Sequence, residues 1–383
     1  MIGEYLRNES SGGALARFTR DLTADARAGR LEPVRCRDQE VSRVIDILLR
    51  HGKNNPTLVG PAGVGKTAIA EGFAQRIAAE HVPLVLRSVR LLSLDHVALL
   101  AGTTYRGQYE ERIRVIVAET TAASDVILFI DELHNLIGQG TAMGAAMDAA
   151  NMLKPALVRG DFRVIGATTS DEYERWVEGD PALERRFQKV VVRELGELEA
   201  LEILHARKER LERHHNVLIS DEALLAAVKL TDLYVTDRMR PDKAIDALDE
   251  ACAHMQAVTE YSESTAELIQ RRMTMLKEAA RVEREAPRRT QEPQTRETIS
   301  AFERFGAELE ALFVGPMPVA TNVDAQKTEA EAKPARVSSL APLEADLARQ
   351  LMEEGIVVRA HDIARVVGLM AGIQIEWEAE QPR

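Results

Sequence analysis

The sequence predicts an α/β fold in which a doubly wound parallel sheet is followed by a small all-α domain. Strand-like apolar runs alternate with helical patterns over the first half of the chain, which is typical of a parallel sheet with helices on both faces. One run leads into the glycine-rich segment 60–67, and another, 126–130, ends in two adjacent carboxylates. From about Glu197 onward the strand signals vanish and helical patterns dominate, so the all-α part comes second.

The expected elements follow in order along the chain. One helical stretch is predicted over 14–28, and a second helix carries apolar residues at helical spacing from Val41 to Leu49. A third helix runs from Lys66 to Ala79. Strands are predicted at 56–59, 89–94, 126–130, 163–168 and 189–193.

Shifts in composition divide the chain into five parts. The Pro- and Arg-containing segment 286–293 and the segment 315–342, which has few large apolar residues, are typical of linkers. The expected parts are a polar, partly helical extension (1–30), the α/β domain (31–196), a small helical lid domain (197–262), a helical insertion with mobile Pro/Ala-rich linkers (263–345), and a C-terminal helical part of the small domain with a tail (346–383).

The segment 60–67 fits the phosphate-binding pattern G-x-x-x-x-G-K-[ST] between a strand and a helix. Its glycines let successive N–H groups converge on phosphates at a helix N-terminus. Lys66 is expected to contact the β- and γ-phosphates, and the Thr67 hydroxyl to take one position around Mg²⁺. The predicted nucleotide contacts are Gly60, Pro61, Ala62, Gly63, Val64, Gly65, Lys66, Thr67 and Ala68.

The run 126–130 is apolar at every position, which suits a strand buried on both faces of a parallel sheet. Ligands of open α/β sheets bind where such strands end. Asp131 is therefore predicted to hold the Mg²⁺ shell, and Glu132 to orient and activate the attacking water. A strand end that is merely solvated by acids is the alternative, and the phosphate loop upstream argues against it. The two motifs together predict an ATPase with ATP and Mg²⁺ as cofactors.

The composition limits the partners and the compartment. The chain of 383 residues is acidic, with a net charge of −12, and has no basic block interleaved with aromatics, so no nucleic-acid partner is expected. Cys36 and Cys252 are far apart and lack metal-type spacing, which fits a reducing cytoplasm. The longest apolar stretch, 84–100, is broken by charged residues, and nothing resembles a signal peptide, so no membrane association is expected.

A series of further motifs falls in order around the two nucleotide motifs. They are Asn54-Asn55-Pro56, Leu91–Asp95, Tyr105-Arg106-Gly107, Asp131–His134, Asn151–Ala156, Gly166–Thr169 and Ala182–Phe187. This run resembles the first ATPase module of the ClpB/ClpA/ClpC class of AAA+ protein unfoldases and disaggregases, over roughly residues 15–260 and again at 358–375. The resemblance implies a P-loop NTPase fold with a helical lid, and a homo-oligomeric ring of six subunits.

The resemblance also implies roles for residues outside the phosphate loop. Thr169 would read the γ-phosphate and position water. Arg185 and Arg186 would reach as fingers into the site of the neighbouring subunit, although a solvated helix face is the usual role of two adjacent arginines. The residues implied at the adenine pocket are Val34 and Arg35 on one side and Ile203 and Pro241 on the lid side.

Tyr105 lies in a polar loop and is followed by Arg106 and Gly107. In the resembled enzymes this loop lies in the central pore and binds the substrate polypeptide. An aromatic ring packs on almost any side chain, so it suits a grip that tolerates many sequences. Half-buried packing is the alternative for a tyrosine in a loop. The stretch 138–151 is expected to form a second pore loop of small residues.

The sequence departs from the family in ways that leave two functions open. The match covers one ATPase module, without the recruiting domain, the second module or the long coiled-coil insertion, and Thr104 replaces a lysine usual before the pore tyrosine. A single-ring ATPase that remodels or unfolds protein is the first hypothesis; a scaffold or regulator that remodels one dedicated partner without threading is the second. Residues 367–369 resemble a peptidase-docking tripeptide but lie in a helix, so no ClpP-type partner is expected.

Overall fold

The computed structural model describes most of the chain. The described residues are 13–102, 106–137, 146–160, 162–285, 332–375 and 377. The chain divides into two compact units, one made of Met1–Ala257 with Val358–Arg383 and the other of Val258–Val357. Within the described part no helix is both long and apolar enough to cross a membrane.

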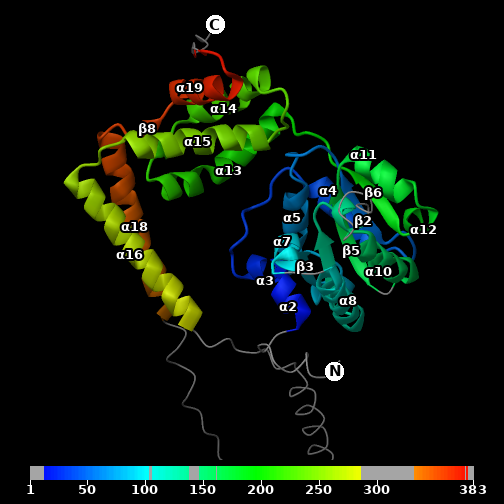
Figure 1. The fold of residues 1–383 in the computed structure, drawn as a ribbon. Helices are drawn as coiled ribbons and strands as arrows, with labels where there is room; N and C mark the ends of the chain where they lie inside the picture. Colours follow the sequence, from blue (N-terminus) through cyan, green and yellow to red (C-terminus); the bar gives the residue numbers. More distant parts are fainter. Residues whose placement is uncertain are drawn as a thin grey trace, which may run out of the picture. The chain divides into compact units, whose positions relative to one another are not determined.

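A six-stranded sheet forms the centre of the first unit (Figure 1). Its strands are β1 (Thr19–Asp21), β2 (Asn55–Val59), β3 (Arg90–Leu94), β4 (Val126–Ile130), β5 (Arg163–Thr168) and β6 (Phe187–Val191). The order is β1-β3-β4-β5-β2-β6, and all neighbours are parallel except the antiparallel pair β1 and β3. The predicted doubly wound parallel sheet is confirmed, with one antiparallel strand added at its edge.

Helices cover both faces of this sheet because its central strands are apolar on both sides. Along β4, Val126, Leu128 and Ile130 join one core, whereas Ile127 and Phe129 join the other. The helices of this part are α2 (Ala14–Phe18), α3 (Leu22–Arg27), α4 (Asp38–Leu48), α5 (Lys66–Ala78), α6 (Leu84–Arg87), α7 (His96–Leu100), α8 (Arg106–Ala122), α9 (His134–Ile137), α10 (Ala146–Arg159), α11 (Ser170–Tyr173), the π-helix η1 (Glu174–Glu178) and α12 (Pro181–Glu184).

The single helix expected over 14–28 is wrong, because β1 separates α2 from α3. Thr19 pairs with Leu94 in the ladder to β3, and the Asp21 carboxylate then caps α3 by accepting the Ala24 amide at 2.8 Å. Phe18 packs in one core of the sheet and Leu22 in the other. Residues Thr19–Asp21 therefore belong to the sheet, and the helices on either side of them pack against it.

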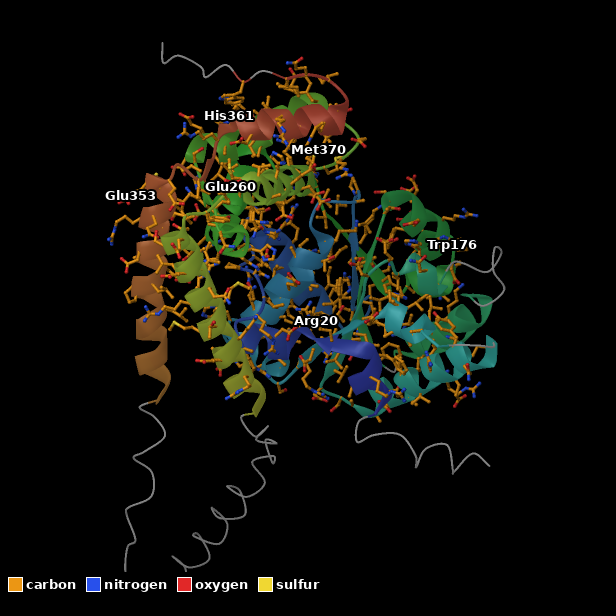
Figure 2. All side chains as sticks on the ribbon, turned by 60° about the vertical axis from the view of Figure 1, so that its left-hand side comes forward. Arg20, Trp176, Glu260, Glu353, His361 and Met370 are labelled. Carbon is orange, nitrogen blue, oxygen red and sulfur yellow. The ribbon has the colours of Figure 1, made fainter. Side chains whose placement is uncertain are left out.

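The lid of the first unit is built from four helices: α13 (Glu197–His215), α14 (Asp221–Tyr234), α15 (Asp242–Val258) and α19 (Ala360–Ala371). Ser220 caps α14 through its hydroxyl, and its amide donates to the Val358 carbonyl at 3.0 Å. This bond joins β7 (Leu218–Ile219) to Val358 in β8 (Val357–Val358), and α14 packs directly on α19. His361 and Met370 mark α19 in Figure 2.

In its described residues the second unit contains two long helices, α16 (Glu263–Glu285) and α18 (Ala332–Glu353). They pack on each other, with Leu343, Leu347 and Leu351 of α18 buried and the Thr265 hydroxyl of α16 bonded to Gln350 at 3.1 Å. The linker expected up to residue 342 is too long, because α18 already begins at Ala332. Proline in the first turn of a helix costs no hydrogen bond, which is why the sequence around Pro334 can be helical.

Candidate active site

The phosphate loop joins β2 to α5 at the carboxyl end of the sheet. Gly65 has φ +89° immediately before the first residue of α5, a conformation that favours glycine. A Cβ on Gly60 would lie 2.3 Å from the Val192 carbonyl oxygen, so no larger residue fits beside β6. The predicted loop residues 60–67 and Ala68 are therefore brought to the N-terminus of a 13-residue helix, where amide groups attract anions.

Lys66 is buried, with 7% of its surface exposed, and its Nζ donates to the carbonyls of Gly60 and Pro61 at 2.9 and 2.8 Å. Burial lowers the pKa of the ammonium group, while the nearby carboxylates of Glu132, Asp131 and Glu172 act in the opposite direction. The Lys66 side chain is thus bonded across the phosphate loop, and its ammonium group lies where the phosphates are predicted to bind.

Asp131 and Glu132 follow β4, two strands away from β2, with β5 between them. The Thr67 hydroxyl donates to Asp131 Oδ2 at 2.8 Å, and the Glu132 amide donates to Asp131 Oδ1 at 3.0 Å. Glu132 itself has φ +49°, a left-handed conformation that costs a residue with a side chain about 1–3 kcal/mol. The turn therefore stores strain at the residue predicted to activate water.

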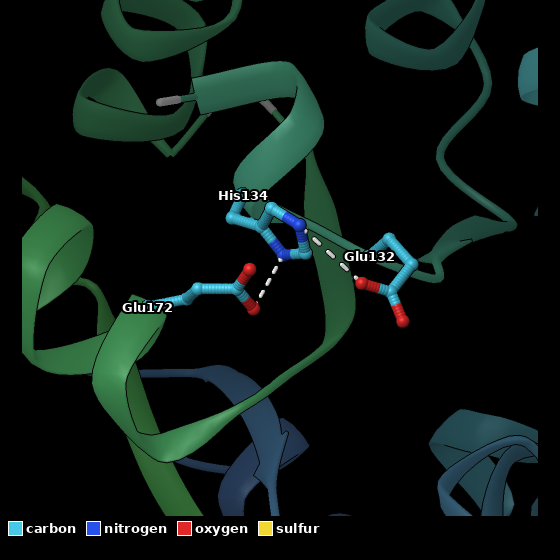
Figure 3. A group of neighbouring side chains, drawn as sticks. All are labelled: Glu132, His134 and Glu172. Atoms are coloured by element: carbon cyan, nitrogen blue, oxygen red, sulfur yellow. Dashed lines mark ion pairs between the residues drawn. The ribbon is translucent and has the colours of Figure 1, made fainter. Parts of the chain in front are cut away.

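A hydrogen-bonded network links Glu132 to the end of β5 (Figure 3). His134 Nε2 lies 3.4 Å from Glu132 Oε2, and His134 Nδ1 lies 2.9 Å from Glu172 Oε2. The same Glu172 oxygen accepts the hydroxyl of Thr169 at 2.7 Å and that of Thr168 at 3.2 Å. His134 is mostly buried, whereas half of the Glu132 side chain is exposed, so the Glu132 carboxylate stays accessible to water.

Burial alone would raise the pKa of Glu172, but hydrogen bonds from Thr169 and Thr168 and the charge of His134 lower it below its ordinary value. Glu172 is therefore an ionised acceptor that holds Thr169, the predicted sensor, by its hydroxyl and its amide. The three ligand-type atoms of Glu132, His134 and Glu172 lie within 4.8 Å of one another. Because hydroxyls already occupy the Glu172 oxygen, this group is better described as a hydrogen-bond network than as a metal site.

The residues at the phosphate loop fit ATP and Mg²⁺. The loop ends in a helix N-terminus, and Lys66 adds a buried cation beside it. Thr67 Oγ1 and Asp131 Oδ2 are oxygens from different elements at 2.8 Å, which is the ligand chemistry that Mg²⁺ prefers. Thr67 and Asp131 would hold the ion, and the loop amides with Lys66 would hold the phosphates.

Arg185 and Arg186 lie at the opposite end of the sheet from the phosphate loop. Arg185 follows α12, and the Arg186 carbonyl accepts the amide of Asn55, the first residue of β2. Since β2 has five residues, these arginines are separated from the loop by about 15 Å of strand. The arginines are therefore not brought to the phosphate loop of their own chain.

The four residues predicted at the adenine pocket lie on two sides, one before α4 and the other in the lid. Val34 packs over Gly72 of α5, and its amide donates to Gln75 Oε1 at 3.3 Å, whereas Arg35 is exposed. Ile203 is half-buried in α13, and Pro241 is buried just before α15. Flanking residues join the two sides: Cys36 Sγ lies 3.4 Å from Glu202 Oε2, and Glu32 pairs with Arg207 at 2.7 Å, both partners lying in α13. The adenine pocket itself stays a prediction.

The predicted pore residues fall largely outside the described part. Tyr105 lies outside the described residues, as does most of the stretch 138–151. Arg106 and Gly107 form the first turn of α8. In the tripeptide 367–369, Val367 is fully buried in α19.

Sequence reasoning missed His96, Glu172 and Arg37, and it gave no role to His134, although that residue ends the motif Asp131–His134. Glu172 had a signal, because Thr169-x-x-Glu172 is the spacing of a helix capping box. Arg37 is 4% exposed and donates to the Val64 carbonyl at 2.6 Å, which braces the phosphate loop from α4's N-terminus. No sequence pattern points to such a contact between distant segments.

Comparisons with known proteins agree with this geometry. Residues 56–195 match the family described as "ATPase family associated with various cellular activities (AAA)", and residues 197–300 match the AAA lid domain. The chaperone protein ClpB of Brucella melitensis is 48% identical over 307 residues, which cover 79% of this chain and 35% of the relative. ClpB of Aquifex aeolicus is 52% identical over 270 residues, covering 70% and 27%.

Solved structures give the same result. The structure of an S. cerevisiae Hsp104:casein complex has a TM-score of 0.58 and 45% identity, covering 64% of this chain and 42% of that chain. An S. cerevisiae Hsp104-ADP complex has a TM-score of 0.59 and 36% identity, covering 73% and 54%. The chain thus spans about a third of the ClpB relatives and about half of the Hsp104 chains. It is an AAA ATPase module of the ClpB class, consisting of an AAA domain and an AAA lid.

Proposed function

We propose that this chain hydrolyses ATP as a ring, in the family expectation a hexamer, and uses the energy to remodel or unfold protein. The observation that carries the proposal is the pairing of Thr67 with Asp131 beside the strained Glu132, at the end of a phosphate loop. ClpB and Hsp104 relatives, one of them in complex with casein, support a polypeptide substrate. The proposal includes a cytoplasmic location and no nucleic-acid partner.

Each residue has a part in hydrolysis. ATP with Mg²⁺ supplies, when bound, the phosphoryl group that water attacks. The amides of the phosphate loop and Lys66 bind the phosphates, while Thr67 and Asp131 orient the ion. Glu132 accepts a proton from water through a carboxylate that is half exposed. Glu172 holds Thr169 in place to contact the γ-phosphate.

Arg185 and Arg186 act in the neighbouring subunit. They lie about 15 Å from the phosphate loop of their own chain, so only a second chain's nucleotide is available to them. Charge on the transferred phosphoryl group is then stabilised from outside the subunit. The nucleotide site is complete only when two copies meet, which is the reason for proposing a ring.

We also propose that Tyr105, with Arg106 and Gly107, contacts the substrate polypeptide in the pore. The position of this segment supports the proposal, since it lies between α7 and α8, close in sequence to the residues that follow β3. The adenine contacts Val34, Arg35, Ile203 and Pro241 and the boundary between the α/β domain and the lid at 196–197 are part of the same proposal.

The test uses Glu132→Gln protein with ATP and fluorescent casein, followed by sizing with light scattering. Casein is expected to co-elute with a hexamer-sized species, and Tyr105→Ala to abolish the co-elution while Tyr105→Phe retains it. A ring that ignores casein would favour the second hypothesis, a remodeller of one dedicated partner. A chain that stays monomeric with ATP would contradict the ring.

A further inference from the structure

His96 lies beside the turn that carries Asp131 and Glu132, although neither nucleotide motif includes it. It opens α7 directly after β3, the strand that pairs with β4. Its Nε2 atom is 3.1 Å from the backbone carbonyl oxygen of Asp131. A carbonyl oxygen only accepts hydrogen bonds, so Nε2 must carry the proton in this contact.

The turn is held from two sides. From β5, the Ala167 carbonyl accepts the Leu133 amide at 2.8 Å. From the side of β3, the other neighbour of β4, His96 of α7 donates to the Asp131 carbonyl. Between these two bonds lies Glu132, with φ +49°. A left-handed residue with a side chain persists only when its surroundings fix it, and these bonds fix the peptides before and after it.

The helix that carries His96, α7, is held by contacts at both ends. Arg112 of α8 donates to the carbonyls of Leu99 and Ala101 at 2.7 and 2.8 Å, at the end of α7. The guanidinium group also lies 5.1 Å from the centre of the Phe18 ring. Leu99 is fully buried, and the Asp95 carboxylate caps the start of α7 by accepting the Ala98 amide at 2.9 Å. A short helix fixed at both ends can hold a donor in one place.

We propose that His96 is a positioning residue for ATP hydrolysis: its Nε2–H fixes the Asp131–Glu132 peptide and so aims the Glu132 carboxylate at the attacking water. The proposal rests on the proposed hydrolytic role of Glu132. It adds a residue from α7, the helix that follows β3 and lies outside both nucleotide motifs. Since α7 and α8 flank residues 103–105, the same bond ties the hydrolytic turn to the helices on either side of the predicted substrate loop.

Three variants test the proposal. His96→Leu removes the donor, His96→Gln restores an N–H donor of similar reach, and Val97→Ala changes an exposed neighbour on the same helix as a control. For His96→Leu we expect kcat to fall about tenfold, the effect of one lost hydrogen bond, while KM for ATP changes by less than about twofold. His96→Gln is expected to recover most of kcat, and Val97→Ala to match the wild type.

Two readouts do not depend on hydrolysis. Amide hydrogen exchange in peptides covering 126–137 is expected to rise in His96→Leu and to stay unchanged in peptides covering 163–168. Nitrogen-15 NMR of histidine-labelled wild type, with His96→Gln assigning the signal, is expected to find a proton on Nε2. A proton on Nδ1 alone, unchanged exchange, or a loss of kcat that His96→Gln does not recover would each overturn the proposal.

These readouts also separate the inference from the function beneath it. If the wild type fails to hydrolyse ATP, the proposed function falls, and the exchange and NMR results still decide whether His96 holds the turn. If the wild type hydrolyses ATP and His96→Leu changes only KM, the function stands and the positioning role is wrong.

Discussion

The two ends of the six-stranded sheet differ in whether their charged side chains have partners within the chain. At the carboxyl end, charged and polar groups are bonded to one another: Thr67 to Asp131, and His134 to Glu132 and Glu172. At the amino end, Arg185 is exposed, and among the described residues neither it nor Arg186 has an ion-pair partner. The first arrangement is complete within one chain, and the second leaves two arginines available for the contact with another chain that we propose.

A third pair of residues sharpens this comparison. Arg90 and Asp125, at the amino ends of β3 and β4, form an ordinary ion pair at 2.7 Å. The amino end of the sheet can therefore pair its arginines, and it does so away from β6. The unpaired state of Arg185 and Arg186 is thus a local property of the segment between α12 and β6.

The largest expected effect is at the carboxyl end. Lys66→Ala removes the buried cation from the phosphate loop, so we expect affinity for ATP to fall by about 100-fold. Equilibrium binding of a fluorescent ATP analogue measures it, with Lys53→Ala, a surface lysine, as the control. Retained affinity would show that phosphates bind elsewhere.

Glu132→Gln separates binding from chemistry at the same end. The amide cannot take a proton from water, so we expect turnover to fall by about 100-fold or more while ATP affinity is retained. Steady-state phosphate release and nucleotide binding are measured on the same preparation. Turnover close to that of the wild type would mean that another group acts as the base.

Mixing subunits tests the amino end. If Arg185 and Arg186 act on a neighbour, a double Arg185→Ala/Arg186→Ala variant blocks sites in wild-type subunits of the same ring. At an equal mixture we expect ATPase activity far below one half of the wild-type rate. Activity that falls in simple proportion to the wild-type fraction would contradict action between subunits. The matched control is Arg90→Ala, which removes a paired arginine from the same end and is expected to leave the ATPase rate of an equal mixture at the wild-type level.

The smallest effect concerns the stability of that control. The hydrogen bond from Arg90 holds the pKa of Asp125 below its ordinary value. The pair therefore stabilises the fold above the unfolded pKa near 4, and this stabilisation is lost as pH falls through the lowered pKa. Because both side chains are about 40% exposed, we expect less than about 0.5 kcal/mol from the pair. Thermal melting of the wild type and Arg90→Ala should differ slightly at pH 7, and the difference should shrink as the pH falls below about 4.

The sequence predicted the parts of the site that depend on neighbours along the chain. The phosphate loop needs only glycines, Lys66 and Thr67 in one segment, and five consecutive apolar residues predict β4. Contacts between distant segments could not be predicted in this way. His96 and Asp131 are 35 residues apart, and nothing in the sequence near His96 indicates a donor to that carbonyl.

The fold was predictable to the same extent. A parallel sheet follows from alternating strands and helices, and it is confirmed apart from the antiparallel strand β1. The three-residue strand β1 has no apolar alternation from which it could be predicted. Its position in the sheet is fixed by pairing with β3. Short edge strands are defined by the partner that they meet, so the helical pattern around Phe18 and Leu22 prevailed in the prediction.

The contact between α14 and α19 has a consequence for the order in which the chain can fold during synthesis. The residues of α14 end at Tyr234, and those of α19 begin at Ala360. At a synthesis rate of about 5–20 residues per second, α14 waits roughly 6–25 s for its partner. The sheet, whose last strand ends at Val191, has all its strands long before then. The ATP-binding sheet is therefore finished first, and the core of the lid is completed only when α19 has emerged.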